Sequence, residues 1–313
     1  MKQLLIIVLA LITSSCCNAK KVAQDSPKQI SQNTSVTVDE IPEVVEDSIT
    51  QTIEVVDKKG NTIIEVDTIE EAEELMTKKD SIKTNDDFHQ NLTKKVYSNV
   101  HQIWDELLEA NVTDLGNVNY KSFKSNHERL LGYIHILNLM KSHEKFESFS
   151  REEKLAYWIN AYNALTVDLI LRNYPVKSIK DIKDPWEQRL WKLGDKWYNL
   201  DEIEHQILRK MDEPRIHFAI VCASYSCPKL QNKAFTSDNL ETQLTNATKE
   251  FLNDSKRNEI TENSLELSKI FKWFSKDFKQ NGSLIDFLNQ YVSVTISDDA
   301  KISYKDYNWD LND

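Results

Sequence analysis

The feature that most constrains the fold is one apolar stretch, SREEKLAYWINAYNALTVDLILRNYP, which spans residues 150–175. Ser150 and Glu153 have the spacing of a capping box, which begins a helix, and Pro175 marks its end. Between Leu155 and Leu171, only two asparagines, one threonine and one aspartate interrupt apolar or aromatic residues. A helix that is apolar nearly all round has to be covered all round. We therefore predict a buried central helix.

The segments around this helix mix helical patterns with short strand patterns. Helices are predicted over residues 87–110, 120–142, 201–211, 236–254 and 283–292. Strands are predicted from the β-branched and aromatic content of KWYNL, RIHFAIVCAS and LELS. Strands and helices do not alternate regularly, which argues against a doubly wound sheet. We predict a mainly helical α+β domain, with the central helix packed on a small antiparallel sheet.

Composition divides the chain near Asp87, because every tryptophan, tyrosine and phenylalanine follows that residue. Residues 18–87 contain 17 acidic and 8 basic residues. Their apolar residues are too few to form a core. We predict an acidic disordered tether over residues 17–86 and a globular domain over residues 87–313. The alternation TIEVVDKKGNTIIEV predicts a hairpin within the tether. The globular part has no basic stripe, so no nucleic acid partner is expected.

The N-terminus has the pattern of an export signal. Its unbroken apolar run from Leu4 to Ile12 is too short to span a bilayer. The following SSCC resembles a lipoprotein signal, in which Cys16 would carry the lipid, and cleavage after Ala19 is the alternative. We expect a signal over residues 1–16, export to the periplasm or cell envelope, and membrane contact through the lipid anchor. Cys222 and Cys227 then remain as side-chain thiols of the mature protein.

Those two cysteines lie in HFAIVCASYSCP, residues 217–228. In a strand, His217 and Cys222 would point to opposite faces. Cys227 follows a polar turn and precedes Pro228, a residue favoured at the first helical position. A helix starting there would stabilise a Cys227 thiolate, and the turn would bring the thiolate back to His217. A Cys222–Cys227 disulfide, or two inert thiols, are the alternatives.

Polar residues elsewhere are further candidates for the site. Asn160 and Asn163 lie one turn apart on the central helix and need partners, either a loop backbone or an imidazole that they would orient. Glu204 and His205 form a second polar pair. His205, His217 and a cysteine lack the spacing typical of zinc sites, so we predict no metal and no cofactor.

The segments in their order resemble the domain-of-unknown-function 547 family. The resemblance rests on EEKLAYWINAYNAL, NYPVKSI, LDEIEHQILR, RIHFAIVCASYSCPKL, IFKWFSKDF and ISYKDYNWDLND. The family implies a domain of no established activity, found in exported bacterial proteins and in plant leucine-zipper proteins. A weaker similarity links the chain to transglutaminases and papain-like proteins, whose central helix begins with the cysteine. Here that helix carries Asn160 and no cysteine.

Two functional hypotheses follow. The first is a cell-envelope thiol hydrolase or transferase, directed at acyl or amide groups, with Cys227 as nucleophile, His217 as base and Asn160 or Asn163 as orienting group. The second is a non-catalytic, lipid-anchored module that binds a small molecule or an envelope component in a pocket formed by the central-helix residues and His217. The candidate binding residues are Trp158, Glu204, His205 and Ser224.

Overall fold

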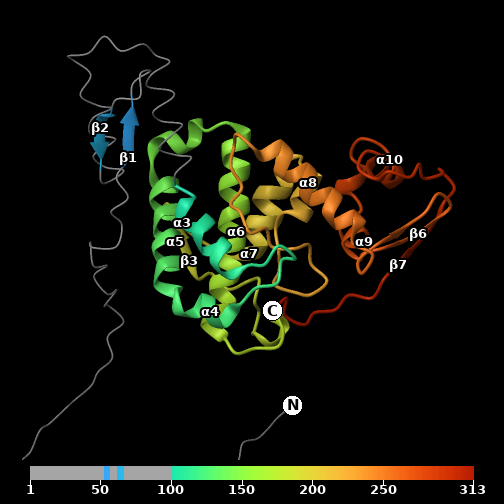
Figure 1. Ribbon diagram of the computed structural model, residues 1–313, viewed down its shortest axis with the longest axis horizontal. Coiled ribbons are helices and arrows are strands. Elements are labelled where there is room, and N and C mark those ends of the chain that lie inside the picture. Colours follow the sequence, from blue (N-terminus) through green and yellow to red (C-terminus); the bar gives the residue numbers. More distant parts are fainter. Residues whose placement is uncertain (1–52, 57–61, 67–99) are drawn as a thin grey trace, which may run out of the picture. The chain divides into compact units, whose positions relative to one another are not determined.

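The computed structural model describes residues 53–56, 62–66 and 100–313 (Figure 1). The predictions for the signal segment, for Cys16, for most of the tether and for residues 87–99 lie outside the described residues. Strands β1 (Ile53–Val56) and β2 (Thr62–Val66) pair antiparallel. The hairpin predicted from the alternating sequence is therefore confirmed.

The central helix α6 (Arg151–Asn173) lies where the sequence predicts it. The Ser150 hydroxyl accepts the Glu153 N–H, and the Glu153 carboxylate accepts the Ser150 N–H, so the capping box is present. Every residue from 155 to 171 is buried. The prediction of a helix covered all round is confirmed.

The elements before α6 are helical. Helix α3 (Gln102–Asn111) is followed by α4 (Tyr120–Ser125) and α5 (His127–Ser142), and a 3-10 turn, η2 (Glu144–Ser148), leads into α6. The helix predicted over residues 120–142 is thus divided at Asn126. Helices α5 and α6 lie side by side (Figure 1). The hairpin of β3 (Trp191–Leu193) and β4 (Lys196–Tyr198) packs against α5.

Apart from the β3–β4 hairpin, the regular elements between α6 and the second half of the domain are short helical turns. These are η3 (Ile179–Asp181), α7 (Leu200–Glu202), the π-helical turn η4 (Ile203–Ile207), and the 3-10 turns η5 (Leu208–Met211) and η6 (Pro214–Phe218). The strand predicted over residues 215–224 is wrong, because residues 214–218 are helical. Pro214 at the start of η6 and the Glu213 carboxylate, which accepts the Arg215 N–H, favour the helical turn.

The C-terminal part contains α8 (Leu240–Asn253), α9 (Ile270–Trp273), η7 (Asp277–Lys279), α10 (Leu284–Asn289) and a three-stranded sheet. In that sheet β6 (Ser264–Leu267) lies between β5 (Glu259–Ile260) and β7 (Lys301–Tyr304). Strand β5 is antiparallel to β6, and β7 is parallel to it. The α+β class is confirmed, but this sheet is mixed rather than antiparallel, and α6 packs mainly on helices.

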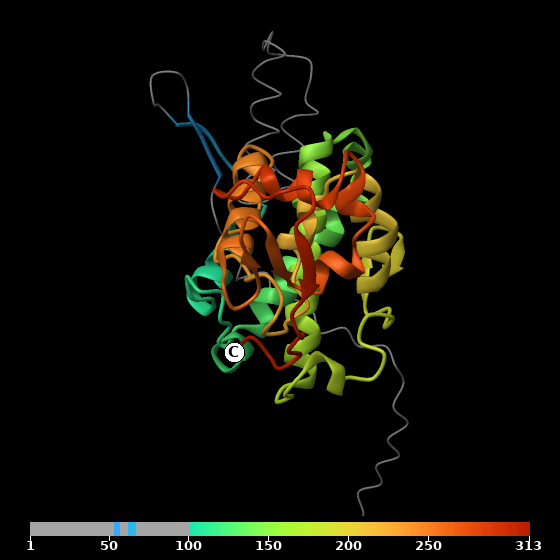
Figure 2. The ribbon, with the colours of Figure 1, turned by 90° about the vertical axis from the view of Figure 1, so that its right-hand side faces the viewer.

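After β7 the chain returns to the N-terminal helices (Figure 2). The Asn312 carbonyl accepts the Val118 N–H at 2.7 Å, and the Asn312 side chain accepts the Tyr120 hydroxyl at 2.7 Å. On its way the chain passes the turn that carries both cysteines. The last residues therefore contribute to the candidate site described below.

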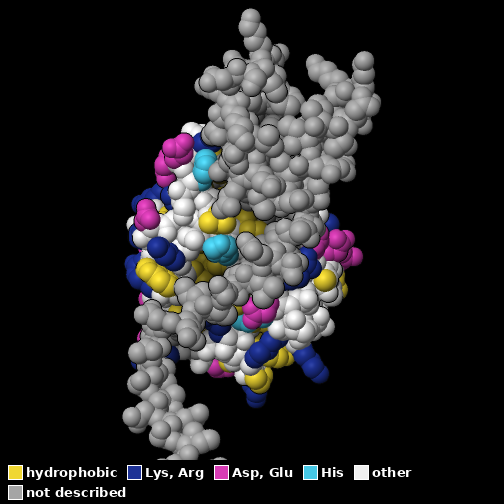
Figure 3. Space-filling view, turned by 90° about the vertical axis from the view of Figure 1, so that its left-hand side faces the viewer, with side chains coloured by type: hydrophobic (Ala, Val, Ile, Leu, Met, Phe, Trp, Pro, Cys, Tyr) yellow, Lys and Arg dark blue, Asp and Glu magenta, His cyan; other side chains and the backbone are white. Residues whose placement is uncertain are grey.

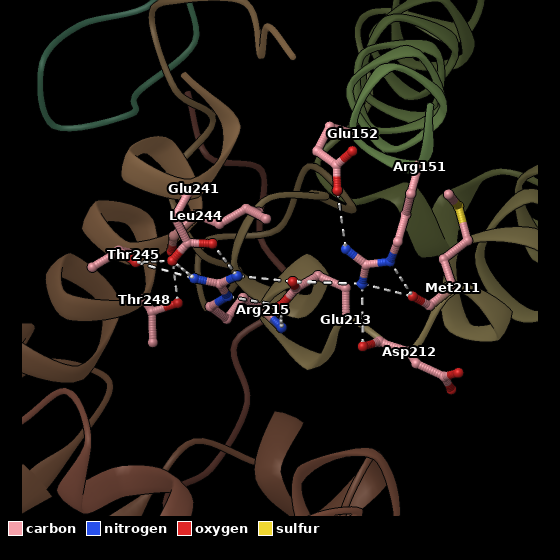
Figure 4. A network of polar contacts seen from close by, with 10 residues as sticks. All are labelled: Arg151, Glu152, Met211, Asp212, Glu213, Arg215, Glu241, Leu244, Thr245 and Thr248. Carbon is pink, nitrogen blue, oxygen red and sulfur yellow. Dashed lines mark hydrogen bonds and ion pairs between the residues drawn. The ribbon is translucent and has the colours of Figure 1, made fainter. Parts of the chain in front are cut away.

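A network of charged side chains fixes the turn η6 (Figure 4). Arg215 donates to the Glu213 carboxylate at 2.7 and 2.8 Å and to the Glu241 carboxylate of α8 at 2.6 and 2.8 Å. Arg151, at the start of α6, donates to the Met211 carbonyl. These hydrogen bonds to Glu213 and Glu241 raise the pKa of Arg215. The network joins α6, η6 and α8 next to His217.

Charged side chains of both signs are interspersed on the visible surface in Figure 3. Within the part of the chain that the structure describes, no helix is both long and apolar enough to cross a membrane.

Candidate functional site

A cavity of about 260 Å³ lies where α6, η4, η6, α9 and the C-terminal segment meet. Four of the residues that the sequence singles out line it, namely Glu204, His205, His217 and Cys227. Cys222 lines it as well. The structure thus brings together the cysteine segment and the Glu204–His205 pair, which are separate blocks in the sequence.

The two cysteines are neighbours across a tight turn. Their sulfur atoms lie 2.7 Å apart, and both are free thiols. The turn closes through the Cys227 N–H, which donates to the Ser224 carbonyl at 3.0 Å. Ala223 adopts a positive φ of 59°, which bends the chain between the cysteines. No helix begins at Pro228, so the predicted helix N-terminus at Cys227 is wrong.

The Cys227 sulfur accepts hydrogen bonds from several donors. The Cys222 N–H donates at 3.1 Å and the Tyr307 hydroxyl donates at 3.3 Å. Burial alone would raise the pKa of Cys227, but the hydrogen bonds from Cys222, Tyr307 and Ser224 outweigh it and lower the pKa to about 6. The pKa of Cys222 is raised, by its hydrogen bond to Cys227 and by burial. These hydrogen bonds favour the thiolate on Cys227 over a thiolate on Cys222.

Tyr307 reaches the sulfurs because the chain end is bound to the cysteine turn. The Tyr225 N–H donates to the Asp310 carbonyl at 2.7 Å, and the Ser226 N–H donates to the Asn308 carbonyl at 3.2 Å. The Ser224 hydroxyl lies 2.8 Å from the Tyr307 hydroxyl. The Ser224 hydroxyl also lies 3.2 Å from the Cys222 sulfur, and its hydrogen bonding contributes to the lowered pKa of Cys227.

His217 lies in the cavity wall without touching the cysteines. Its Nε2 donates to the Asp277 carboxylate at 2.8 Å, and its ring stacks on Phe274 at 3.9 Å between centroids. Arg209 donates to both oxygens of the same carboxylate, at 2.6 and 2.8 Å. Burial lowers the pKa of His217. Within residues 100–313, no hydrogen bond joins His217 to Cys227, so the predicted thiolate–imidazole pair is not formed.

Glu204 and His205 also line the cavity. The Tyr162 hydroxyl of α6 donates to the Glu204 carboxylate at 3.0 Å. Burial is the largest cause that raises the pKa of Glu204. His205 lies 3.1 Å from an Arg209 nitrogen, measured at Nδ1, and 3.5 Å from the Asp201 carboxylate, measured at Nε2. Among the described residues, no cluster of histidine, cysteine and carboxylate side chains is arranged to hold a metal ion.

The two asparagines of α6 bind loop backbone instead of lining the cavity. Asn160 donates to the Phe235 carbonyl at 2.7 Å and accepts the Phe235 N–H at 3.0 Å. Asn163 donates to the Ala219 carbonyl at 2.9 Å and accepts the Val221 N–H at 2.9 Å. Neither side chain contacts an imidazole. The backbone alternative left open by the sequence is the one that the structure shows.

Trp158 is likewise part of the core, 4% exposed, with its ring against Tyr157 and Tyr198. It does not line the cavity. The aromatic residues that do line it, and that the sequence reasoning missed as site residues, are Tyr162, Trp186, Trp273, Phe274, Tyr307 and Trp309. Four of these, Trp273, Phe274, Tyr307 and Trp309, lie in the two C-terminal blocks IFKWFSKDF and ISYKDYNWDLND, which carry the resemblance to the family. Their place in those blocks is the sequence signal that could have identified them as site residues.

Residues 146–252 match a family model described as "Protein of unknown function, DUF547". No curated protein and no solved structure matches the chain. The matched segment begins just before α6 and ends within α8, so it contains both cysteines, Glu204, His205 and His217. The match supports the resemblance to the DUF547 family for the sequence blocks that lie within residues 146–252, and the function of that family is unknown.

Proposed function

We propose that the cavity is the active site of a thiol-dependent hydrolase or transferase that acts on acyl or amide groups, with Cys227 as nucleophile. The observation that carries the proposal is the Cys227 sulfur itself. It faces a cavity and accepts the Cys222 N–H and the Tyr307 hydroxyl, which favour a thiolate near neutral pH. The thiolate is formed without a histidine base.

In this proposal the Cys227 thiolate attacks the carbonyl carbon of the substrate. A carbon–sulfur bond forms, the bond to the leaving group breaks, and the leaving group takes a proton. Glu204 is the candidate proton donor, because burial raises the pKa of its carboxyl and because it lines the same cavity. Water or another acceptor then cleaves the thioester and regenerates the thiolate.

In this proposal, His217 and Asn163 do not react with the substrate and instead position other groups of the site. His217 is held by Asp277, which Arg209 holds in turn, so His217 shapes the cavity wall and carries no proton for Cys227. Asn163 binds the carbonyl of Ala219 and the N–H of Val221, directly before Cys222, and thereby fixes the approach to the cysteine turn.

The test is acylation by activated esters and thioesters, followed by intact-mass measurement. We expect one acyl group per protein at Cys227, with turnover lost in Cys227→Ala and retained in Leu139→Ala, a surface control on α5. Acylation that proceeds equally in Cys227→Ala would refute the proposal.

The aromatic lining favours one second candidate, a non-catalytic binding module. Rings of Trp186, Trp273, Tyr307 and Trp309 lie 4.6–6.0 Å apart between centroids, from Tyr307–Trp309 to Trp186–Trp309, and Trp273 is 47% exposed. Such surfaces bind flat or apolar ligands. A ligand that quenches tryptophan fluorescence equally in the wild type and in Cys227→Ala would favour binding without catalysis.

We also propose that the chain is exported and anchored by a lipid on Cys16. The support is the sequence SSCC after a short apolar run. Replacing both Cys16 and Cys17 by serine should move the protein from the membrane fraction to the soluble fraction. Unchanged membrane partitioning would contradict the anchor.

A further inference from the structure

We propose that Cys222 and Cys227 form a dithiol–disulfide couple that exchanges reversibly with external disulfides. Both sulfurs line the cavity, both are free, and they lie 2.7 Å apart. Sulfurs in a disulfide lie about 2.05 Å apart. The oxidised pair therefore requires only a small approach of two atoms that are already neighbours.

The backbone holds the sulfurs together in a way that suits both redox states. The chain end binds the backbone of the turn through the N–H groups of Tyr225 and Ser226 and through the Asn312 N–H, which donates to the Ala223 carbonyl at 3.2 Å. None of these bonds uses a sulfur atom. Oxidation therefore leaves the support of the turn in place, and reduction does not release it.

The two thiols have different exposure and different protonation. Cys222 is half-buried, whereas Cys227 is buried with 4% of its surface exposed, at the wall of the cavity. The Cys222 N–H donates to the Cys227 sulfur at 3.1 Å, and the Tyr307 hydroxyl lies 3.3 Å from that sulfur and 3.5 Å from the Cys222 sulfur, so the geometry favours the thiolate on Cys227. An asymmetric pair of this kind has one attacking and one resolving thiol.

The exchange balances as follows. The Cys227 thiolate attacks one sulfur of a disulfide R–S–S–R′, forming a Cys227–S–R mixed disulfide and releasing R′–S⁻. The released thiolate takes the proton of Cys222. The Cys222 thiolate then attacks the Cys227 sulfur, forming the Cys222–Cys227 disulfide and releasing R–S⁻, which takes a proton from water. The protein loses two electrons, and the external disulfide gains them.

This couple stands independently of the acyl chemistry proposed above, although the disulfide would withdraw the Cys227 nucleophile. The experiment reads the thiols themselves, so it can fail while acylation succeeds, and the reverse. Full-length protein with Cys16→Ser and Cys17→Ser, which leaves Cys222 and Cys227 as its two cysteines, is equilibrated in mixtures of reduced and oxidised glutathione, quenched in acid and alkylated, and its mass is measured. We expect one two-electron transition in which both cysteines change together, reversed by reduction of the folded protein.

Two single variants assign the roles. After reaction with hydroxyethyl disulfide, Cys222→Ser should accumulate one mixed disulfide per protein on Cys227, whereas the wild type should proceed to the internal disulfide. Cys227→Ser should react at least tenfold more slowly than Cys222→Ser, because among the described residues the Cys222 sulfur accepts no backbone N–H like the one that donates to the Cys227 sulfur at 3.1 Å. Either of two results with the wild-type cysteine pair would overturn the proposal. One is two free thiols at the highest ratio of oxidised to reduced glutathione. The other is a disulfide that can be reduced only after the protein is unfolded.

Discussion

The pH dependence of Cys227 alkylation follows directly from the hydrogen bonds to its sulfur. Iodoacetamide reacts with the thiolate, so the rate at each pH reports the thiolate fraction. With a pKa of about 6, Cys227 is roughly nine-tenths thiolate at pH 7, whereas a thiol of ordinary pKa, about 8.5, is only a few per cent thiolate. The rate, normalised to its plateau, should therefore reach its midpoint near pH 6.

Two substitutions test which side chains determine the midpoint pH of Cys227 alkylation. Tyr307→Phe removes the hydroxyl that donates to Cys227 at 3.3 Å. A hydrogen bond to a charged group contributes about 1.5 kcal/mol, which corresponds to about one pH unit. The midpoint should rise by that amount. His217→Ala should leave it unchanged, because His217 bonds to Asp277 and not to Cys227. The sequence alone predicts the reverse, since it pairs His217 with the thiolate.

The assay is alkylation of reduced protein over pH 5–9, with fragment-ion masses to distinguish the two cysteines on one peptide. Cys222 should react well only after unfolding or at high pH, because its pKa is raised. A Cys227 midpoint at pH 8 or above, or a midpoint that shifts with His217→Ala and not with Tyr307→Phe, would refute the hydrogen-bond account.

Three stability predictions follow from burial and charge, each measured by denaturant unfolding. Leu165→Ala on α6, at 0% exposure, should lower the free energy of unfolding by about 2–5 kcal/mol, whereas Leu139→Ala, at 44%, should change it little; equal effects would contradict a buried α6. Arg215→Met should cost about 3–5 kcal/mol because it leaves a buried carboxylate without its main partner. Arg189→Met should cost about 1 kcal/mol or less, because the Arg189 side chain is 51% exposed and its partner Glu202 keeps Lys196; similar losses in the two variants would refute this. Burial lowers the pKa of His101 from 6.5 to about 4, so between these pH values the unfolded state binds a proton that the folded state does not. The free energy of unfolding should therefore fall by about 3 kcal/mol as the pH decreases from 6.5 to about 4. His101→Gln should remove that part of the pH dependence, and an unchanged pH profile in this variant would refute the assignment.

The central helix could be predicted because its signals are local. The capping box needs only Ser150 and Glu153, and an apolar surface all round forces burial whatever the partners are. The partners themselves could not be predicted. The antiparallel sheet expected beneath α6 is replaced by helices, because a helix that is apolar on every face carries no information about which element covers which face.

The segment RIHFAIVCAS shows why a strand was predicted and not found. Its β-branched and aromatic residues suit a pleated surface, but a strand also needs a backbone partner. Here Asn163 provides one: its amide oxygen accepts the Val221 N–H, and its amide nitrogen donates to the Ala219 carbonyl. One side chain thus makes the two bonds that a neighbouring strand would make. Propensity cannot reveal this substitution, since the asparagine lies more than fifty residues earlier in the chain.

The same contact changes the meaning of the polar residues on α6. The sequence left two roles open for Asn160 and Asn163, and both residues bind backbone. Asn163 nevertheless acts on the site, because the loop that it binds leads directly into Cys222. A hydrogen bond to the Cys227 sulfur comes from Tyr307, which lies 80 residues later in the chain and is brought there by the chain end bound to the cysteine turn. The cysteine turn is therefore positioned by Asn163 of the buried helix, and its Cys227 sulfur accepts a hydrogen bond from Tyr307 near the C-terminus. Neither a local motif nor the alternation of a strand can predict that arrangement.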